Sequence, residues 1–224
     1  MNTEELKSLA LMVDKIFPAI IAAIAAFTVA VIGFTVNTWS VLKQIKEKKK
    51  EERRKEIYKM LNDFYGPFQS YLNTSKELSK LLFVGKPKEF RTLTYLLDPN
   101  QKYRDQNGQE TSVVLDTVDN ELLKEIVEIG AKLESLIVEK AGLVDDVVLR
   151  YDYKPSVSIT DVKLKDNGLL TFAKVHFHLI RLASQGKLRG DVTRFQDYVY
   201  PRELNNKIET KITELQKELN LLSK

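Results

Sequence analysis

Cysteine is absent from this 224-residue chain, and histidine occurs only as His176 and His178. Without cysteine the chain has no disulfide, no thiolate nucleophile and no cysteine-ligated zinc, which suits a reducing cytosol. The phosphate-binding patterns Gly-x-x-x-x-Gly-Lys-Ser/Thr and Gly-x-Gly-x-x-Gly are missing, as is the Gly-x-Ser-x-Gly pattern of serine hydrolases. The sequence therefore predicts no catalytic residue and no cofactor, and we expect the protein not to be an enzyme.

Charge is also absent, over the whole stretch from Ile16 to Leu42. Its apolar core, residues 16–36, would be roughly 31 Å long as a helix at about 1.5 Å per residue, close to the thickness of a bilayer's hydrocarbon layer. A helix also satisfies every backbone amide within the span. We therefore predict one transmembrane helix over residues 16–38.

The residues before this stretch bear on a competing interpretation, a cleaved signal peptide. A signal peptide begins with a positively charged region and has a short apolar segment. In residues 1–15 three acidic residues stand against two basic ones, and the apolar stretch that follows is longer than a signal peptide requires. We expect residues 1–15 to form a short helix outside the cytoplasm.

Basic residues are concentrated just after the apolar stretch. Residues 43–59 contain nine Lys or Arg and four Glu, a net charge of +5 in a chain of +4, so the remainder sums to −1. Basic residues beside a span mark its cytoplasmic side and contact anionic lipid head groups, which predicts an outside N-terminus and a cytoplasmic C-terminal part. Because the rest of the chain is not basic, we expect no nucleic-acid partner. The basic cluster that we expect to face the lipid consists of Lys43, Lys46, Lys48, Lys49, Lys50, Arg53, Arg54 and Lys55.

One face of the predicted span carries small side chains. Ala22, Ala26 and Ala30 recur every four residues, and Ala19 and Ala23 form a second such pair. Small residues at this spacing let two helices approach closely in a membrane. Alanine is also an ordinary constituent of spans, so the sequence leaves open whether the protein forms a homo-oligomer through this face.

Past residue 38 the sequence predicts a chain built mainly of helices. Residues 39–65 should continue the span as a basic juxtamembrane helix, which Gly66-Pro67 ends or kinks. Apolar residues at helical spacing predict the remaining helices. These helices cover residues 67–83, 88–97, 117–141 and 169–184, and a last one begins at residue 201. We expect a mainly α fold, in which one transmembrane helix continues into a cytosolic helical bundle over residues 66–224.

Three segments of this domain leave alternatives or interrupt the helices. Residues 156–165 alternate between apolar and polar, which predicts a small β-hairpin or an extended loop. The turn residues between Asp98 and Gly108 predict a polar loop. The apolar residues of the last helix are spaced four, four, three, four and three apart, so this seam packs either within the bundle or against another chain.

The histidines and paired aspartates are the remaining candidates for chemistry. On a helix His176 and His178 point about 200° apart, so we predict no shared metal ion. We expect His176 at the edge of the core and His178 near a polar neighbour or solvent. Asp145 and Asp146 lack the spacing of a cation-binding loop and fit the first turn of a helix. The sequence thus predicts no metal site.

Short stretches of the chain resemble a loose group of uncharacterised bacterial inner-membrane proteins with one span and a helical cytosolic domain. The stretches are Ile57-Tyr58, Tyr65-Gly66-Pro67-Phe68, Ala141-Gly142-Leu143-Val144-Asp145-Asp146 and Tyr200-Pro201-Arg202-Glu203-Leu204. The resemblance implies a bacterial source, a single-pass inner-membrane protein and the same architecture. It implies no activity and no site residue. Proteins of this shape can serve as membrane-tethered effectors or sensors in phage defence, which is an analogy of form alone.

Together these features predict a membrane-tethered, non-enzymatic interaction or sensor module that binds a cytosolic protein, in a bacterial stress or phage-defence setting. An alternative is an effector that oligomerises through the alanine face and perturbs the bilayer. A hydrolase that uses His176 or His178 is a third hypothesis.

Overall fold

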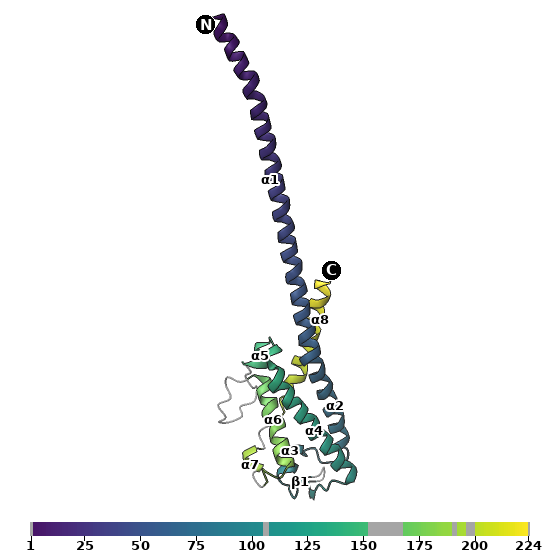
Figure 1. The fold of residues 1–224 in the computed structure, drawn as a ribbon. Helices are drawn as coiled ribbons and strands as arrows, with labels where there is room; N and C mark the ends of the chain where they lie inside the picture. The colour runs from purple at the N-terminus through teal and green to yellow at the C-terminus, as the bar shows by residue number, and fades with distance from the viewer. Residues whose placement is uncertain (1, 105–107, 152–167, 190–191, 196–199, 224) are drawn as a thin grey trace. The chain divides into compact units, whose positions relative to one another are not determined.

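The computed structural model describes residues 2–104, 108–151, 168–189, 192–195 and 200–223 (Figure 1). The chain forms two compact units, Met1–Arg54 and Lys55–Lys224, and each is described by itself. Helices account for 79% of the residues, which confirms the prediction of a mainly helical protein.

The first unit consists of a single helical segment. Helix α1 (Thr3–Met60) runs through Pro18 without interruption and contains a stretch long and apolar enough to cross a membrane. The large apolar side chains of this stretch are exposed all around the helix; Phe27 is 72% exposed and Phe34 73%. A helix that is apolar on every side requires apolar surroundings. The predicted span and the predicted juxtamembrane helix are thus parts of one helix.

A wide π-helical turn follows α1, at the position where we predicted an end or a kink. In η1 (Leu61–Tyr65) the hydrogen bond runs from the Gly66 N–H to the Leu61 carbonyl oxygen, five residues back. Pro67 has no N–H to donate to Asp63, so the regular α-helical ladder cannot pass this point. A Cβ atom on Gly66 would lie 2.8 Å from the Leu61 oxygen, which explains the glycine. The chain then continues as helix α2 (Gly66–Leu82).

The core of the second unit is built around α4 (Thr117–Lys140). Helix α4 packs against α2 and against α6 (Leu169–Ser184), as Figure 1 shows. The Asp116 carboxylate caps α4 by accepting a 2.8 Å hydrogen bond from the Asp119 N–H. Burial of each large apolar side chain along α4 contributes about 2 kcal/mol to the stability of the folded chain. The buried apolar residues of α4 are Leu123, Ile126, Ile129, Leu133 and Ile137.

Among the described residues this unit also has four shorter helical elements. They are α3 (Thr92–Leu97), the 3-10 turn η2 (Ala141–Leu143), α5 (Val147–Arg150) and α7 (Val192–Phe195). Asp146 precedes α5 and its carboxylate accepts a hydrogen bond from the Leu149 N–H, 3.0 Å away. The prediction holds in part, because Asp146 caps this helix from just before its first turn, whereas Asp145 lies outside the helix and forms an ion pair of 3.0 Å with Lys211.

The last helix, α8 (Glu203–Leu222), packs against η1, α2 and α6. Leu204, Ile208 and Leu215 are at most 1% exposed and belong to the main core cluster. Three further residues of the predicted seam, Ile212, Leu219 and Leu222, are partly buried against the same cluster. The seam is therefore directed into the chain's own core.

A small β-hairpin lies where we predicted a polar loop, and that prediction is wrong. Strand β1 (Lys102–Arg104) pairs antiparallel with β2 (Glu110–Ser112), and Tyr103 is opposite Thr111. Gly108 between the strands has φ +79°, which a glycine adopts without strain. Residues 156–165, where we predicted a hairpin or an extended loop, lie outside the described residues.

Candidate functional site

Three threonine hydroxyls in the apolar part of α1 bond to the helix's own backbone. The Thr28 hydroxyl donates to the Ile24 carbonyl oxygen over 2.8 Å, and the Thr38 hydroxyl donates to that of Phe34 over 2.8 Å. The hydroxyl of Thr35 likewise donates to a backbone carbonyl oxygen one turn earlier in the helix. Such bonds remove the need for water at these hydroxyls, which suits a helix in hydrocarbon.

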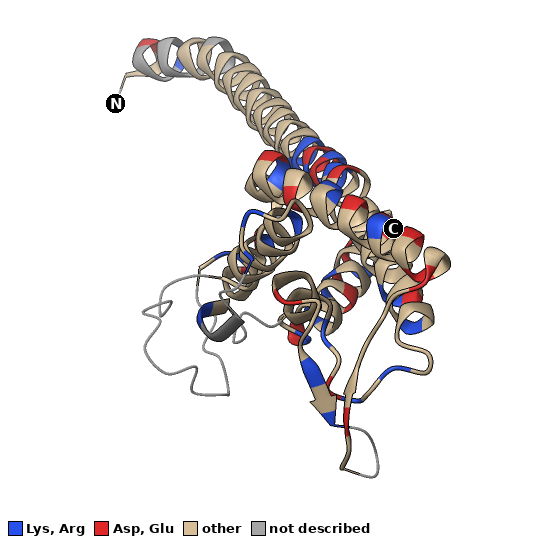
Figure 2. Ribbon diagram, turned by 90° about the horizontal axis from the view of Figure 1, so that it is seen from below, with Lys and Arg blue, Asp and Glu red and all other residues tan. Residues whose placement is uncertain are grey.

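The basic cluster follows on the same helix. In Figure 2 the apolar stretch of α1 contains no charged residue, and Lys or Arg (blue) and Asp or Glu (red) follow it along the helix. Lys43, Lys46, Lys48 and Lys49 are exposed, and Lys43 Nζ lies 5.6 Å from the centre of the Trp39 ring. Lys50, Arg53 and Arg54 are half-buried, and Lys55 is exposed at the beginning of the second unit. Solvent thus reaches the side chains of Lys43, Lys46, Lys48 and Lys49 directly beside the apolar stretch.

The predicted helix-association face lies along the same uninterrupted helix. Because α1 is α-helical throughout, Ala22, Ala26 and Ala30 share one face. Gly33 and Asn37 continue this face at the same three- and four-residue spacing, which sequence reasoning missed. Nothing lies within 4 Å of the place that a Cβ atom on Gly33 would occupy. The face therefore combines small residues with an amide that can bond across helices.

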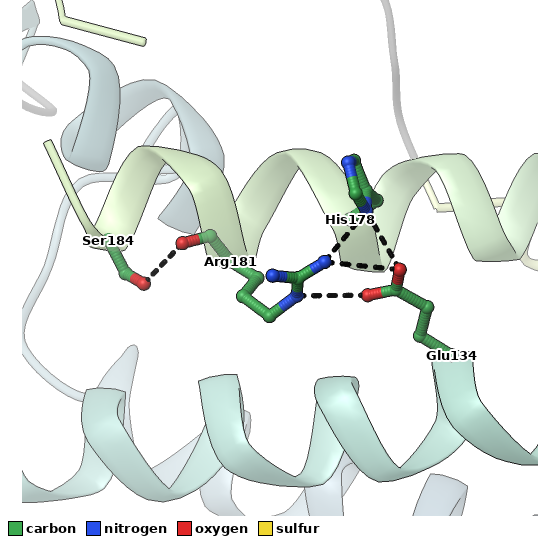
Figure 3. A network of polar contacts seen from close by, with 4 residues as sticks. All are labelled: Glu134, His178, Arg181 and Ser184. Carbon is green, nitrogen blue, oxygen red and sulfur yellow. Dashed lines mark hydrogen bonds and ion pairs between the residues drawn. The ribbon is translucent and has the colours of Figure 1, made fainter. Parts of the chain in front are cut away.

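A cluster of polar side chains in the second unit joins α4 to α6, and sequence reasoning missed it (Figure 3). Arg181 Nε donates to Glu134 Oε2 over 3.1 Å, and Arg181 Nη2 lies 3.3 Å from Glu134 Oε1. His178 Nδ1 lies 2.7 Å from Glu134 Oε1 and 2.9 Å from Arg181 Nη2. Glu134 comes from α4, and the other two side chains come from α6. We call these three residues the Glu134 cluster.

The charges of the Glu134 cluster stabilise one another. Burial opposes ionisation of the Glu134 carboxyl, but the hydrogen bonds from Arg181 and His178 outweigh it and lower the pKa of Glu134. The same bond to Glu134 raises the pKa of the Arg181 guanidinium. Since a guanidinium only donates and a carboxylate only accepts, we assign the imidazole proton to Nδ1, which donates to Glu134 over the shorter contact. The 2.9 Å contact between Arg181 Nη2 and Nδ1 then joins two donors and is not a hydrogen bond.

The Glu134 cluster is arranged as an ion pair between helices. The nearby Ser184 hydroxyl donates to the Arg181 carbonyl oxygen over 2.8 Å and is not directed at His178. His176, on the other side of α6, lies 5.8 Å from the ring centres of Phe177 and Tyr200. The predicted separation of the two histidines is confirmed, and a hydrolase that uses either one stays a prediction. Within the described residues no group of three or more His, Asp or Glu side chains is placed to hold a metal ion.

Two buried tyrosine hydroxyls, of Tyr65 and Tyr103, have no hydrogen-bond partner within the described residues. Burial, with a smaller contribution from Asp98, raises the pKa of Tyr103 to about 12. Burial also raises the pKa of Tyr65, and the Asp145 carboxylate adds to this effect. Both hydroxyls are therefore neutral at cellular pH.

A hollow of about 540 Å³ lies beside the hairpin. One wall is the turn Val84–Pro87 after α2, and the other is the chain from Thr111 to Val114. Asp119 of α4 also lines it and accepts a 2.9 Å hydrogen bond from Lys86 Nζ. We call this hollow the β2 groove. No motif marked it, because its walls come from separate parts of the sequence.

Comparison of the chain with models of protein families, with curated proteins and with solved structures gives no match.

Proposed function

We propose that this protein is a membrane-tethered interaction module, whose helix α1 crosses the bacterial inner membrane and whose second unit binds a cytosolic protein. The observation that carries the proposal is the nature of α1. Its apolar stretch is exposed on every side, whereas Ile57 and Met60 near its end are at most 3% exposed and belong to the core of the second unit. One helix thus supplies both a membrane anchor and part of a folded domain.

Binding explains the second unit better than catalysis does. In its Glu134 cluster the side chains bond to one another. The surface instead offers a sizeable hollow and exposed apolar side chains beside it, Val84 at 72% and Val114 at 83%. Exposed apolar side chains around a hollow are typical of a surface that meets a partner.

A second candidate function is a membrane-perturbing oligomer. The observation that favours it is the face of Ala22, Ala26, Ala30, Gly33 and Asn37 along α1, which suits close association of copies. In this case the assembled spans would open the bilayer to solutes.

Reconstitution of the full chain into vesicles loaded with a self-quenched dye separates the two functions. The tether predicts that dye is retained at every protein density. The effector predicts release that increases with density and is lost in Ala26→Leu, because the larger side chain separates the helices. Dye release that follows this pattern would overturn the tether as the main function.

A further inference from the structure

The β2 groove has one wall with unused backbone hydrogen-bonding groups. Strand β2 pairs with β1 along one edge, and no other strand accompanies it within the described residues. Past the end of β2, Val113 and Val114 make no backbone hydrogen bond with any described residue. A strand edge of this kind presents N–H and C=O groups to whatever lies beside it.

The opposite wall does not compete for these groups. In the turn Val84–Pro87, the Val84 N–H donates to the Leu81 carbonyl oxygen over 3.2 Å, and the Lys86 N–H donates to that of Phe83 over 3.1 Å. Pro87 has no N–H. Of the N–H groups in this turn, those of Val84 and Lys86 are therefore already used, whereas those of Val113 and Val114 on the β2 side make no backbone hydrogen bond with a described residue.

The charges around the groove are already paired. Lys86 and Asp119 form an ion pair of 2.9 Å whose side chains are 9% and 19% exposed. Lys102 and Glu110, which lie outside the lining of the groove, form an exposed pair of 2.9 Å across the hairpin. A charged ligand would find no free counter-charge among these four residues and would lose its hydration, which is costly. The groove thus complements an uncharged ligand.

Apolar side chains border the same hollow. Val84 on one wall is 72% exposed and Val114 on the other is 83% exposed. A volume of about 540 Å³ is within the range of ligand-binding pockets, about 300–1,000 Å³.

We propose that the β2 groove binds an uncharged, extended segment of a partner protein, which adds to the sheet as a third strand beside β2. Main-chain hydrogen bonds to the edge of β2 hold the segment, and apolar side chains at alternate positions cover Val84 and Val114. This inference rests on the proposed function, because it names the kind of partner that the second unit recruits.

The test uses the full chain in lipid nanodiscs and a set of fluorescent peptides of about eight residues, long enough for one strand. In the peptides threonine alternates with valine, isoleucine, leucine or phenylalanine. Fluorescence anisotropy reports binding. We expect saturable binding of at least one of these peptides.

Two valines give a matched pair of variants for this test. Val114→Glu places a charge at the rim of the groove, whereas Val138→Glu places one at a 66% exposed position near the other end of α4. Both positions are exposed, so neither variant should disturb the core. We expect Val114→Glu to weaken peptide binding at least about tenfold, because the bound peptide would bury the charge, and Val138→Glu to leave binding unchanged.

N-methylated peptides test the strand geometry itself. In an added strand alternate amides face β2, so methylation of one alternating set of amides should abolish binding and methylation of the other set should not. The proposal is overturned if no peptide binds saturably, if the two methylated sets behave alike, or if Val114→Glu and Val138→Glu have equal effects. An affinity for peptide that falls as the concentration of the chain rises would assign the groove to a second copy instead, and would also overturn it.

Failure of the peptide-binding proposal can be distinguished from failure of the proposed membrane tether. Peptide binding measured in nanodiscs does not depend on which side of a cell membrane the second unit faces. A chain that binds peptide but is not anchored in the membrane would keep the groove and overturn the tether. A chain that is anchored in the membrane but binds no peptide would overturn the groove proposal and keep the tether.

Discussion

Gly66 shows how one residue permits the turn between α1 and α2. A Cβ atom there would lie 2.8 Å from the Leu61 carbonyl oxygen, a backbone atom that cannot rotate away. We predict that Gly66→Ala lowers the free energy of unfolding of the second unit by about 1–3 kcal/mol, because the π turn must shift. Chemical denaturation followed by circular dichroism measures this. The control is Gly142→Ala, where nothing lies within 4 Å. Equal stability of the two variants would contradict this account of Gly66.

Glu134 makes the stability of the second unit depend on pH. The pKa of Glu134 is lowered in the folded chain, so its contribution is present above the ordinary pKa of about 4.5 and is lost as the pH falls through the lowered value. We predict that Glu134→Gln destabilises the unit by about 1 kcal/mol at pH 7, and that the difference from the wild type shrinks in acid. Urea denaturation across this pH range measures it.

An exposed glutamate on the same helix provides the control for that series. Glu128 faces solvent on α4, so we expect Glu128→Gln to leave the stability at pH 7 unchanged. A Glu134→Gln variant that is as stable as Glu128→Gln at pH 7 would show that the Glu134 cluster contributes nothing to the packing of α4 on α6.

Single residues were predictable from sequence only where their partners are close in the chain. Asp146 caps the helix that begins at the next residue, and its role follows from local spacing. Glu134 and Arg181 are 47 residues apart, and Lys86 and Asp119 are 33 apart. Their contacts depend on how helices pack, which short-range patterns do not contain.

At the scale of elements, the periodicity of apolar residues predicted the long helices and failed for the hairpin. A helix such as α4 repeats its apolar positions over 24 residues, which is ample for the pattern to be read. Strands β1 and β2 have three residues each, too few to show an alternation. Asn107-Gly108 was the available signal, since this dipeptide favours tight hairpin turns.

Helix α1 carries the clearest prediction at this scale. We expect Ala26→Leu to reduce cross-linking between copies in membranes, because a bulky side chain on the small-residue face prevents close approach. Ala25→Leu adds the same volume about 100° around the helix and should have less effect. Cross-linking that is unchanged in Ala26→Leu would remove the face of Ala22, Ala26 and Ala30 as an association surface.

At the scale of the whole molecule, the residues of the basic cluster should orient the chain. We predict that replacing Lys48, Lys49, Lys50, Arg53, Arg54 and Lys55 by glutamine produces a mixture of orientations, because basic residues close to a span set its direction. Reporter fusions after residue 224 measure the fraction on each side. A variant with the same single orientation as the wild type would show that other residues set the topology.

The helices of the molecule could be predicted from the sequence, but its surface features could not. The printed sequence shows the long uncharged stretch and the breaks between the later helices. Helix α1 and the mainly helical second unit agree with these two features. The β2 groove could not be predicted, because Val84–Pro87, Thr111–Val114 and Asp119 meet only after the unit has folded.

The most direct test of the membrane tether uses the absence of cysteine from the chain. Single cysteines at Asn2→Cys and Ser223→Cys can be labelled in bacterial spheroplasts with a maleimide that does not cross membranes. A single span with the second unit inside predicts that Asn2→Cys is labelled in intact spheroplasts, that Ser223→Cys is labelled only after lysis, and that alkaline carbonate leaves both chains in the membrane. Extraction of the chain by carbonate, or the reverse pattern of labelling, would contradict this account.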